Sequence, residues 1–192
     1  MATRSYHHGD LRTALIEAAL ASIERTGGDE LSLREIARSV GVSAAAVYRH
    51  FPDKDALMAA VAQVGYDRLA AAQQAASDAA GGGAAGFSAT GATYVRFALA
   101  NPGLFRLVFA HPAPHGMLGP DGTNPTDAMK MLQETAARLA PPGSDPGLLA
   151  LRAWALVHGL AMLLLDGQVT LDDAGIAAAV DVRALVDPAA NA

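Results

Sequence analysis

The chain has 192 residues, of which 52% are hydrophobic and 17% are charged, a balance that suits one or two small domains with a buried core. Its 14 Lys and Arg residues against 19 Asp and Glu residues give a net charge of −5, which excludes a broadly basic nucleic-acid coat protein. The absence of cysteine excludes disulfides, cysteine-ligated zinc and thiol nucleophiles.

Two short helices are predicted before residue 41. The first covers about residues 10–25 and ends at a pair of glycines. The second begins at Ser32, where Ser32 and Glu35 have the spacing of a capping box, with the hydroxyl bonding the Glu35 N–H and the carboxylate bonding back to Ser32. Its apolar residues recur at helical spacing and predict the buried face: Leu33, Ile36, Ala37 and Val40.

The next segment predicts a sharp turn and two further helices. Gly41 allows the turn, and Ser43 caps a third helix that ends near His50. Asp53 caps a long fourth helix that starts just after Pro52. Two short helices joined by a three-residue turn that contains glycine are a helix-turn-helix.

The rest of the chain also has helical periodicity and no alternating strand pattern. Three segments rich in Gly or Pro interrupt it, at residues 77–88, 111–125 and 140–146. The last two helices are predicted over about residues 146–167 and 171–187. The most apolar stretch, 148–165, contains an arginine and a histidine and barely reaches the length of a membrane span, so we expect a cytoplasmic protein with no membrane partner.

Several segments, read in order, resemble the DNA-binding domain of TetR-family transcriptional regulators. They are YHHGDLRTALIEAALASIERTG, LSLREIARSVGVS and AAVYRHFPDKDAL, which together run from about Tyr6 to Leu57. Further along, NPGLFRLVF (residues 101–109) and the Trp-Ala-Leu-Val-His-Gly run at 154–159 are similar to a TetR C-terminal domain class that carries a Trp-His-Gly element.

The resemblance implies an all-α protein with two domains. Residues 1–57 would form the helix-turn-helix DNA-binding domain, and residues 58–192 a larger helical domain for ligand binding and dimerisation. It further implies a homodimer, joined by the last two helices, that binds a palindromic operator in double-stranded DNA and is released by a small-molecule effector. We therefore expect a repressor; an activator or architectural regulator of the same fold, or a ligand-binding protein without DNA specificity, are the alternatives.

The resemblance also implies which side chains meet DNA. The expected contact residues are Ser32, Arg34, Ser43, Ala44, Ala45, Ala46, Tyr48, Arg49, His50 and Lys54. Arg34 is expected to read a base, because arginine pairs well with guanine O6 and N7. Ser32, Tyr48, His50 and Lys54 are expected at phosphates, since hydroxyl, imidazole and ammonium groups all reach phosphate oxygens. The three alanines can only pack on thymine methyls or permit close approach.

The aromatic residues and histidines of this segment also admit roles other than DNA contact. Phe51 is expected to be a core residue between two helices, whereas Tyr48 is expected at DNA, with core packing as the alternative. His7 and His8 have no acidic or histidine partner at helical i+4 spacing, so we expect no metal site and no cofactor. No catalytic grouping of Ser, His and Asp and no carboxylate pair is apparent, so an enzyme is not expected.

An effector pocket is expected among the C-terminal helices. Its expected wall residues are mostly apolar and predict a hydrophobic ligand: Tyr94, Phe97, Phe105, Met129, Leu132 and Trp154, with His158 nearby. His158 admits two interpretations. It is either a core histidine that is hydrogen-bonded inside the helix bundle, or a polar group facing a ligand pocket or a dimer interface.

Overall fold

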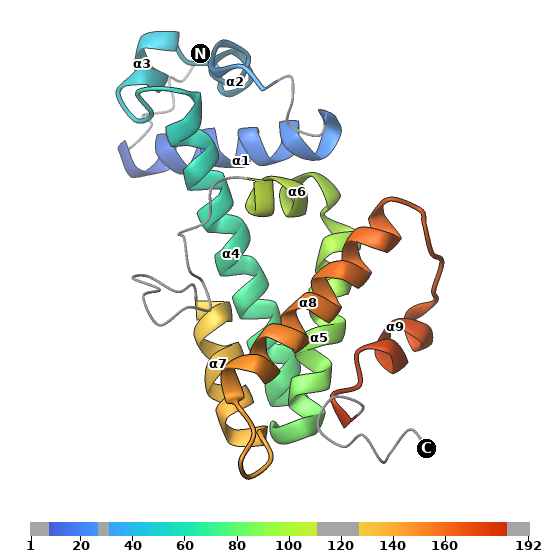
Figure 1. Ribbon diagram of the computed structural model, residues 1–192. Coiled ribbons are helices and arrows are strands. Elements are labelled where there is room, and N and C mark those ends of the chain that lie inside the picture. The colour runs from blue at the N-terminus through green and yellow to red at the C-terminus, as the bar shows by residue number, and fades with distance from the viewer. Residues whose placement is uncertain (1–7, 27–30, 111–126, 184–192) are drawn as a thin grey trace. The chain divides into compact units, whose positions relative to one another are not determined.

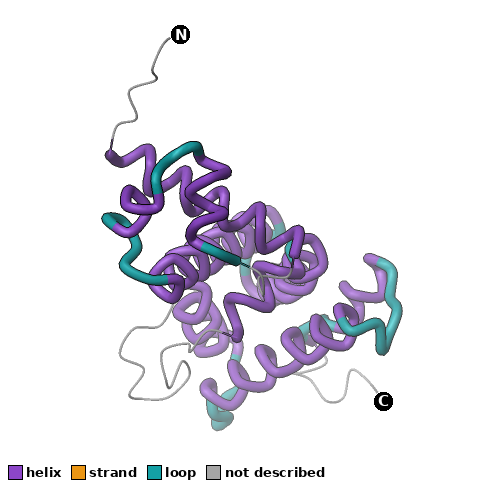
Figure 2. Tube along the Cα trace, turned by 90° about the horizontal axis from the view of Figure 1, so that it is seen from above, coloured by secondary structure: helices purple, strands orange, loops and turns teal. Residues whose placement is uncertain are grey.

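The computed structural model describes residues 8–26, 31–110 and 127–183, and every regular element among them is a helix (Figures 1 and 2). The helices are α1 (His8–Thr26), α2 (Leu33–Val40), α3 (Ala44–Tyr48), α4 (Lys54–Ala79), α5 (Gly83–Ala100), α6 (Pro102–Ala110), α7 (Asp127–Leu139), α8 (Pro146–Leu165) and α9 (Asp173–Ala179). The predicted all-α fold is confirmed. The predicted loop at 111–125 lies outside the described residues.

The chain forms two compact units, and the segments of each are not consecutive. The first unit is Met1–Gly65 together with Asn101–His111, and the second is Tyr66–Ala100 together with Pro112–Ala192. The sequence places a single boundary after residue 57, whereas the first unit continues to Gly65 and also takes in α6. The long helix α4 contributes residues to both units.

Local signals in the first unit act largely as predicted. The Ser43 hydroxyl accepts a 3.2 Å hydrogen bond from the Ala46 N–H and so caps α3. The Asp53 carboxylate accepts a 2.8 Å bond from the Ala56 N–H at the start of α4. Gly41 has a φ of 77°, a left-handed conformation that a residue with a Cβ adopts only at a cost, and it ends α2 with a turn.

The predicted capping box at the start of α2 is wrong. Ser32 is the N-cap residue with an extended backbone, but its side chain makes no capping hydrogen bond. The Ser32 carbonyl instead accepts from the Ile36 N–H at 3.0 Å as the first bond of the helix. The apolar face of α2, by contrast, is confirmed for Leu33, Ile36 and Ala37, which are buried, while Val40 at the end of the helix is half-buried.

Helix α6 packs inside the first unit against α1 and α4. At Gly103, an added Cβ would lie 2.6 Å from the Ile23 carbonyl oxygen of α1. At Gly65, an added Cβ would lie 2.5 Å from Val108 of α6. Glycine therefore lets the three helices approach more closely than any other residue would permit, and Figure 1 shows α6 alongside α1.

The second unit is built on α5, α7, α8 and α9. Helix α5 packs on each of the other three, and α7 also packs on α8. Buried apolar residues join these pairs: Ala92, Val95, Ile176 and Val180 between α5 and α9, and Ala136, Leu149 and Ala150 between α7 and α8. Helix α8 begins as predicted at Pro146, with the Asp145 carboxylate accepting from the Gly147 N–H at 2.8 Å. Helix α9 is shorter than the predicted 171–187, and residues 184–187 lie outside the described part.

Helix α8 has an unusual composition. Over its 20 residues it is apolar enough to cross a membrane by length and composition alone, with a mean hydropathy of 1.9. Only 22% of this stretch is buried in the single chain. Because one side packs on α5 and α7, the remaining apolar side is left uncovered by the residues that the structure describes.

Candidate DNA-binding surface and ligand-binding interior

Helix α3 has one buried side and one exposed side. Ala46 and Val47 are buried, whereas Ala45, Tyr48 and Arg49 are exposed, at positions i, i+3 and i+4 along the helix. Half of the Tyr48 surface is accessible although the side chain is large and aromatic. An exposed face of this kind on the second helix of a helix-turn-helix is suited to contact with a DNA groove.

Ala46 does not lie where the resemblance predicts. A DNA contact is expected for it, but it is only 7% exposed and contributes to the core of the first unit. The reason is the geometry of the helix, because three consecutive residues span about 200° of its circumference and cannot all point outward. Ala44 is half-buried and Ala45 is exposed.

The other predicted contact residues lie around this face. Arg34 on α2 and Lys54 in the first turn of α4 are exposed, while Ser32 and His50 are half-buried. Ser43 is exposed and uses an oxygen lone pair for the α3 cap, which leaves its hydroxyl proton able to bond elsewhere. Sequence reasoning overlooked Arg38, which is exposed one helical turn after Arg34; their spacing of four residues on α2 was the available signal.

Phe51 is a core residue, as predicted. It is 2% exposed, and the Arg12 guanidinium of α1 lies over its ring at 5.2 Å from the centroid. This cation–π contact joins α1 to the segment that connects α3 and α4. It helps to orient the helix that carries the exposed face.

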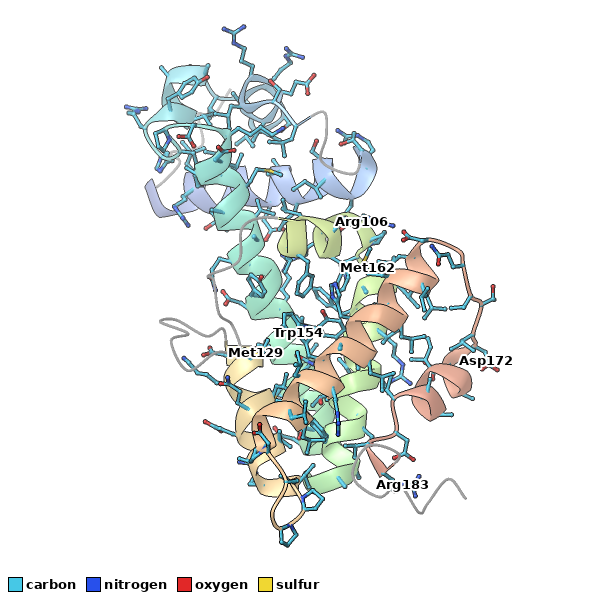
Figure 3. All side chains as sticks on the ribbon, in the orientation of Figure 1. Arg106, Met129, Trp154, Met162, Asp172 and Arg183 are labelled. Atoms are coloured by element: carbon cyan, nitrogen blue, oxygen red, sulfur yellow. The ribbon has the colours of Figure 1, made fainter. Side chains whose placement is uncertain are left out.

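The residues predicted to line a pocket fall in both units. Tyr94 and Met129 are buried in the second unit, where Phe97, Leu132, Trp154 and His158 are half-buried. Figure 3 shows where Met129 projects from α7 and Trp154 from α8. Phe105 belongs instead to α6 of the first unit, where it is fully buried and its ring lies 4.8 Å from that of Phe109.

A chain of hydrogen bonds links α5 to α8. The Tyr94 hydroxyl lies 2.9 Å from Nδ1 of His158 and is also bonded to Trp154. Because an indole N–H can only donate, Tyr94 accepts from Trp154. The direction of the bond between Tyr94 and His158 depends on which ring nitrogen of the histidine carries the proton.

Burial keeps the two titratable groups of this chain uncharged. It lowers the pKa of His158 below its ordinary value near 6.5, and it raises the pKa of the Tyr94 hydroxyl well above its ordinary value of 10. The interior is therefore polar but neutral near pH 7. This arrangement fits the first interpretation of His158, a histidine bonded inside the bundle, and it also places polar atoms in an otherwise apolar interior.

Two residues of this interior were missed in the sequence. Tyr66 and Gln73 both lie on α4, seven residues apart and therefore on one side of the helix. Burial raises the pKa of the Tyr66 hydroxyl, and the Gln73 amide N–H donates to the carbonyl of Thr90 at 3.2 Å. Their helical spacing was the available signal, but nothing in the sequence indicated which helix would face them.

Two family profiles match the chain. Residues 15–61 match the bacterial regulatory proteins of the tetR family, and residues 87–185 match the tetracyclin repressor-like C-terminal domain. The second match alone covers more than half of the chain. The protein belongs to the TetR family.

Solved structures of similar fold agree with this assignment. A protein of unknown function from Rhodococcus sp. RHA1 is 35% identical, with a TM-score of 0.76, and the match covers 94% of this chain and 96% of that one. A proposed transcriptional regulator from Pseudomonas aeruginosa PAO1 is 23% identical (TM-score 0.70; 97% and 95% covered). RolR, solved with its ligand resorcinol, is 20% identical (TM-score 0.62; 94% and 89% covered). A search of curated proteins found no significant match.

Membership of the TetR family identifies the protein as a DNA-binding transcriptional regulator with a helix-turn-helix. The predicted family and fold are confirmed. The family is one of regulators rather than enzymes.

Proposed function

We propose that this TetR-family protein is a cytoplasmic homodimeric repressor that binds a palindromic operator and is released by a small uncharged molecule. The observation that carries the proposal is the exposed side of α3, with Ala45, Tyr48 and Arg49, opposite a fully packed side. Two such helices in a dimer would read successive major grooves about 34 Å apart.

The predicted contact residues divide by chemistry into those that read bases and those that hold the DNA backbone. Arg34 on α2 is the base reader, because its guanidinium can form a bidentate pair with guanine. Lys54, Tyr48, Ser32, Ser43 and His50 hold phosphates, and Ala44 and Ala45 pack on thymine methyls. Few of these groups are charged, so the affinity for any single half-site is modest and depends on both subunits.

The uncovered side of α8 is proposed as the dimer surface. Leu148, Leu151 and Leu163 are 40–48% exposed, and Ala155 and Gly159 are exposed between them at helical spacing. Apart from the adjoining backbone of α8 itself, no described residue lies within 4 Å of a Cβ added at Gly159, so a partner helix could approach closely there. Burying this stripe in a second copy removes apolar surface from water and accounts for the apolar composition of α8.

Selection of genomic fragments by the purified protein tests the proposal. The expected result is enrichment of one palindromic sequence, bound in a salt-dependent way by a dimer that sedimentation confirms. A folded dimer that enriches no sequence, with or without candidate ligands, would contradict sequence-specific binding. A reporter fused to the recovered site then separates a repressor from an activator, because deletion of the regulator raises expression only in the first case.

A further inference from the structure

The Gln73 side chain on α4 has one partnered end and one unpartnered end. Its Nε2 donates to the Thr90 carbonyl of α5 at 3.2 Å, and its Oε1 is buried with no hydrogen-bond partner among the described residues. Because a backbone carbonyl can only accept, the end that faces Thr90 must be the nitrogen, and the unpartnered atom is an acceptor. Buried acceptors without a partner are uncommon in native proteins and call for an explanation.

Gln73 and the hydrogen-bonded chain of Trp154, Tyr94 and His158 both contact helix α5. Thr90, which Gln73 bonds, and Tyr94, which bonds His158, are four residues apart on α5. Gln73 therefore contacts α5 about one helical turn before Tyr94. Polar groups from α4, α5 and α8 thus gather in neighbouring turns of an otherwise apolar helix bundle.

The charged side chains of the second unit lie away from this cluster. Among the described residues from 66 to 100 and from 127 to 183, every Asp, Glu, Lys and Arg is exposed except Asp181. Asp181 is paired with Arg183 and bonded by Ser88, on the α9 side of the unit. An ionised ligand would lose its hydration here and find no opposite charge to replace it.

We propose that the effector of this protein is an uncharged molecule with a hydroxyl or N–H group, which donates a hydrogen bond to Oε1 of Gln73. The apolar body of the molecule would lie among the surrounding aromatic and aliphatic side chains, of which Trp154 is the largest. The inference rests on the proposed function as a ligand-released regulator, and it adds the charge and donor pattern of the ligand.

Three small probes separate the chemical classes, and calorimetry or thermal shift on the full-length protein measures their binding. Phenol carries a donor and no charge, anisole is its methyl ether without the donor, and benzoate carries a negative charge. The expected order is phenol first, anisole weaker by roughly tenfold, and benzoate weakest. Equal binding of phenol and anisole, tighter binding of benzoate, or no binding of any probe would overturn the inference.

Substitution of Gln73 provides a second, independent measurement. Gln73→Met keeps the length of the side chain and removes the whole amide, both the unpartnered acceptor and the N–H that bonds the Thr90 carbonyl. Because these two losses oppose each other, the urea midpoint of the ligand-free protein is expected to change little, and the preference for phenol over anisole is expected to disappear. A clear loss of ligand-free stability with the preference retained would identify Gln73 as a structural residue and overturn the inference. Gln74→Met is the matched control, because Gln74 is exposed on the next position of α4.

The outcomes distinguish this inference from the proposed function. Failure to select any operator would contradict the DNA-binding proposal whatever the probes do. Operator binding without the expected probe order would contradict only the ligand inference. Phenol binding that depends on Gln73 but leaves the operator complex intact would support the binding site and contradict its role in releasing the protein from the operator.

Discussion

The carboxylate of Glu24 in α1 accepts a 3.0 Å hydrogen bond from the backbone N–H of Leu104 in α6, eighty residues further along the chain. The first N–H groups of a helix have no partner inside it, and Glu24 supplies one from another helix. The negative charge also lies at the positive end of the α6 dipole. This bond, with the close approach at Gly103, ties α6 to the DNA-binding unit.

Glu24→Gln tests this cap. The amide oxygen can still accept, but the charge is lost, so the free energy of unfolding is expected to fall by about 0.5–1 kcal/mol in urea denaturation followed by circular dichroism. Glu24→Ala, which removes the acceptor, should cost about 1–2 kcal/mol. The exposed Glu134→Gln on α7 is the control and should change stability little. Equal effects of Glu24→Ala and the control would show that the bond contributes nothing.

Gly65→Ala tests the close packing of α4 on α6. Helix propensity alone would favour alanine by about 1 kcal/mol. The added Cβ would, however, lie 2.5 Å from Val108, and we expect a net loss of about 1–3 kcal/mol from overpacking. Ala59→Gly at an exposed position of the same helix measures the propensity term by itself and should cost about 1 kcal/mol. A stabilised Gly65→Ala variant would contradict the close approach.

Lys54→Ala and Arg34→Ala should affect DNA binding in different ways. Lys54 is expected to hold a phosphate, so its loss weakens binding to every sequence alike and lowers the salt slope by about one. Arg34 is expected to read a base, so its loss costs about 1–3 kcal/mol on the operator and relaxes preference at one base pair. Binding measured at several salt concentrations on the operator and on single-base variants separates the two effects. If Arg34→Ala weakens binding to all of these sites equally, a base-reading role of Arg34 is contradicted.

His158 makes the stability of the second unit dependent on pH. Burial lowers its pKa in the folded protein, whereas the unfolded chain takes up a proton near the ordinary value of 6.5. Below that value the unfolded state binds more protons than the folded state, so the free energy of unfolding falls as the pH decreases. Urea denaturation from about pH 7 to about pH 5 should show this fall, and His158→Gln should reduce it. Identical slopes for the two proteins would contradict the burial of a neutral imidazole.

Leu151→Arg tests the proposed dimer surface. The Leu151 side chain is 48% exposed on α8, so the monomer should tolerate arginine, whereas two desolvated charges facing each other should weaken the dimer by at least about tenfold. Sedimentation velocity measures the change, and operator affinity should fall in parallel. Leu99→Arg on α5 is the control, because Leu99 is 39% exposed and lies outside the α8 stripe. A Leu151→Arg protein that stays dimeric would place the interface elsewhere.

The sequence by itself determined the local elements of this protein. The Ser43 and Asp53 caps, the left-handed Gly41 and the apolar stripe of α2 act through neighbours within a few residues, so spacing alone predicted them. The segments between Tyr6 and Leu57 resemble the TetR DNA-binding domain closely enough to predict the family. The Ser32 cap failed even at this range, because its carbonyl begins the helix while its hydroxyl makes no capping bond.

The tertiary structure decided which helix meets which. The placement of α6 beside α1, the burial of Ala46 and the meeting of Gln73 with Thr90 depend on contacts between segments that are distant in the sequence. Helical periodicity shows which side of a helix is apolar, but it does not name the partner that covers that side. Phe105 illustrates the limit, since its apolar side chain fitted a pocket wall equally well until packing placed it in the core of the DNA-binding unit.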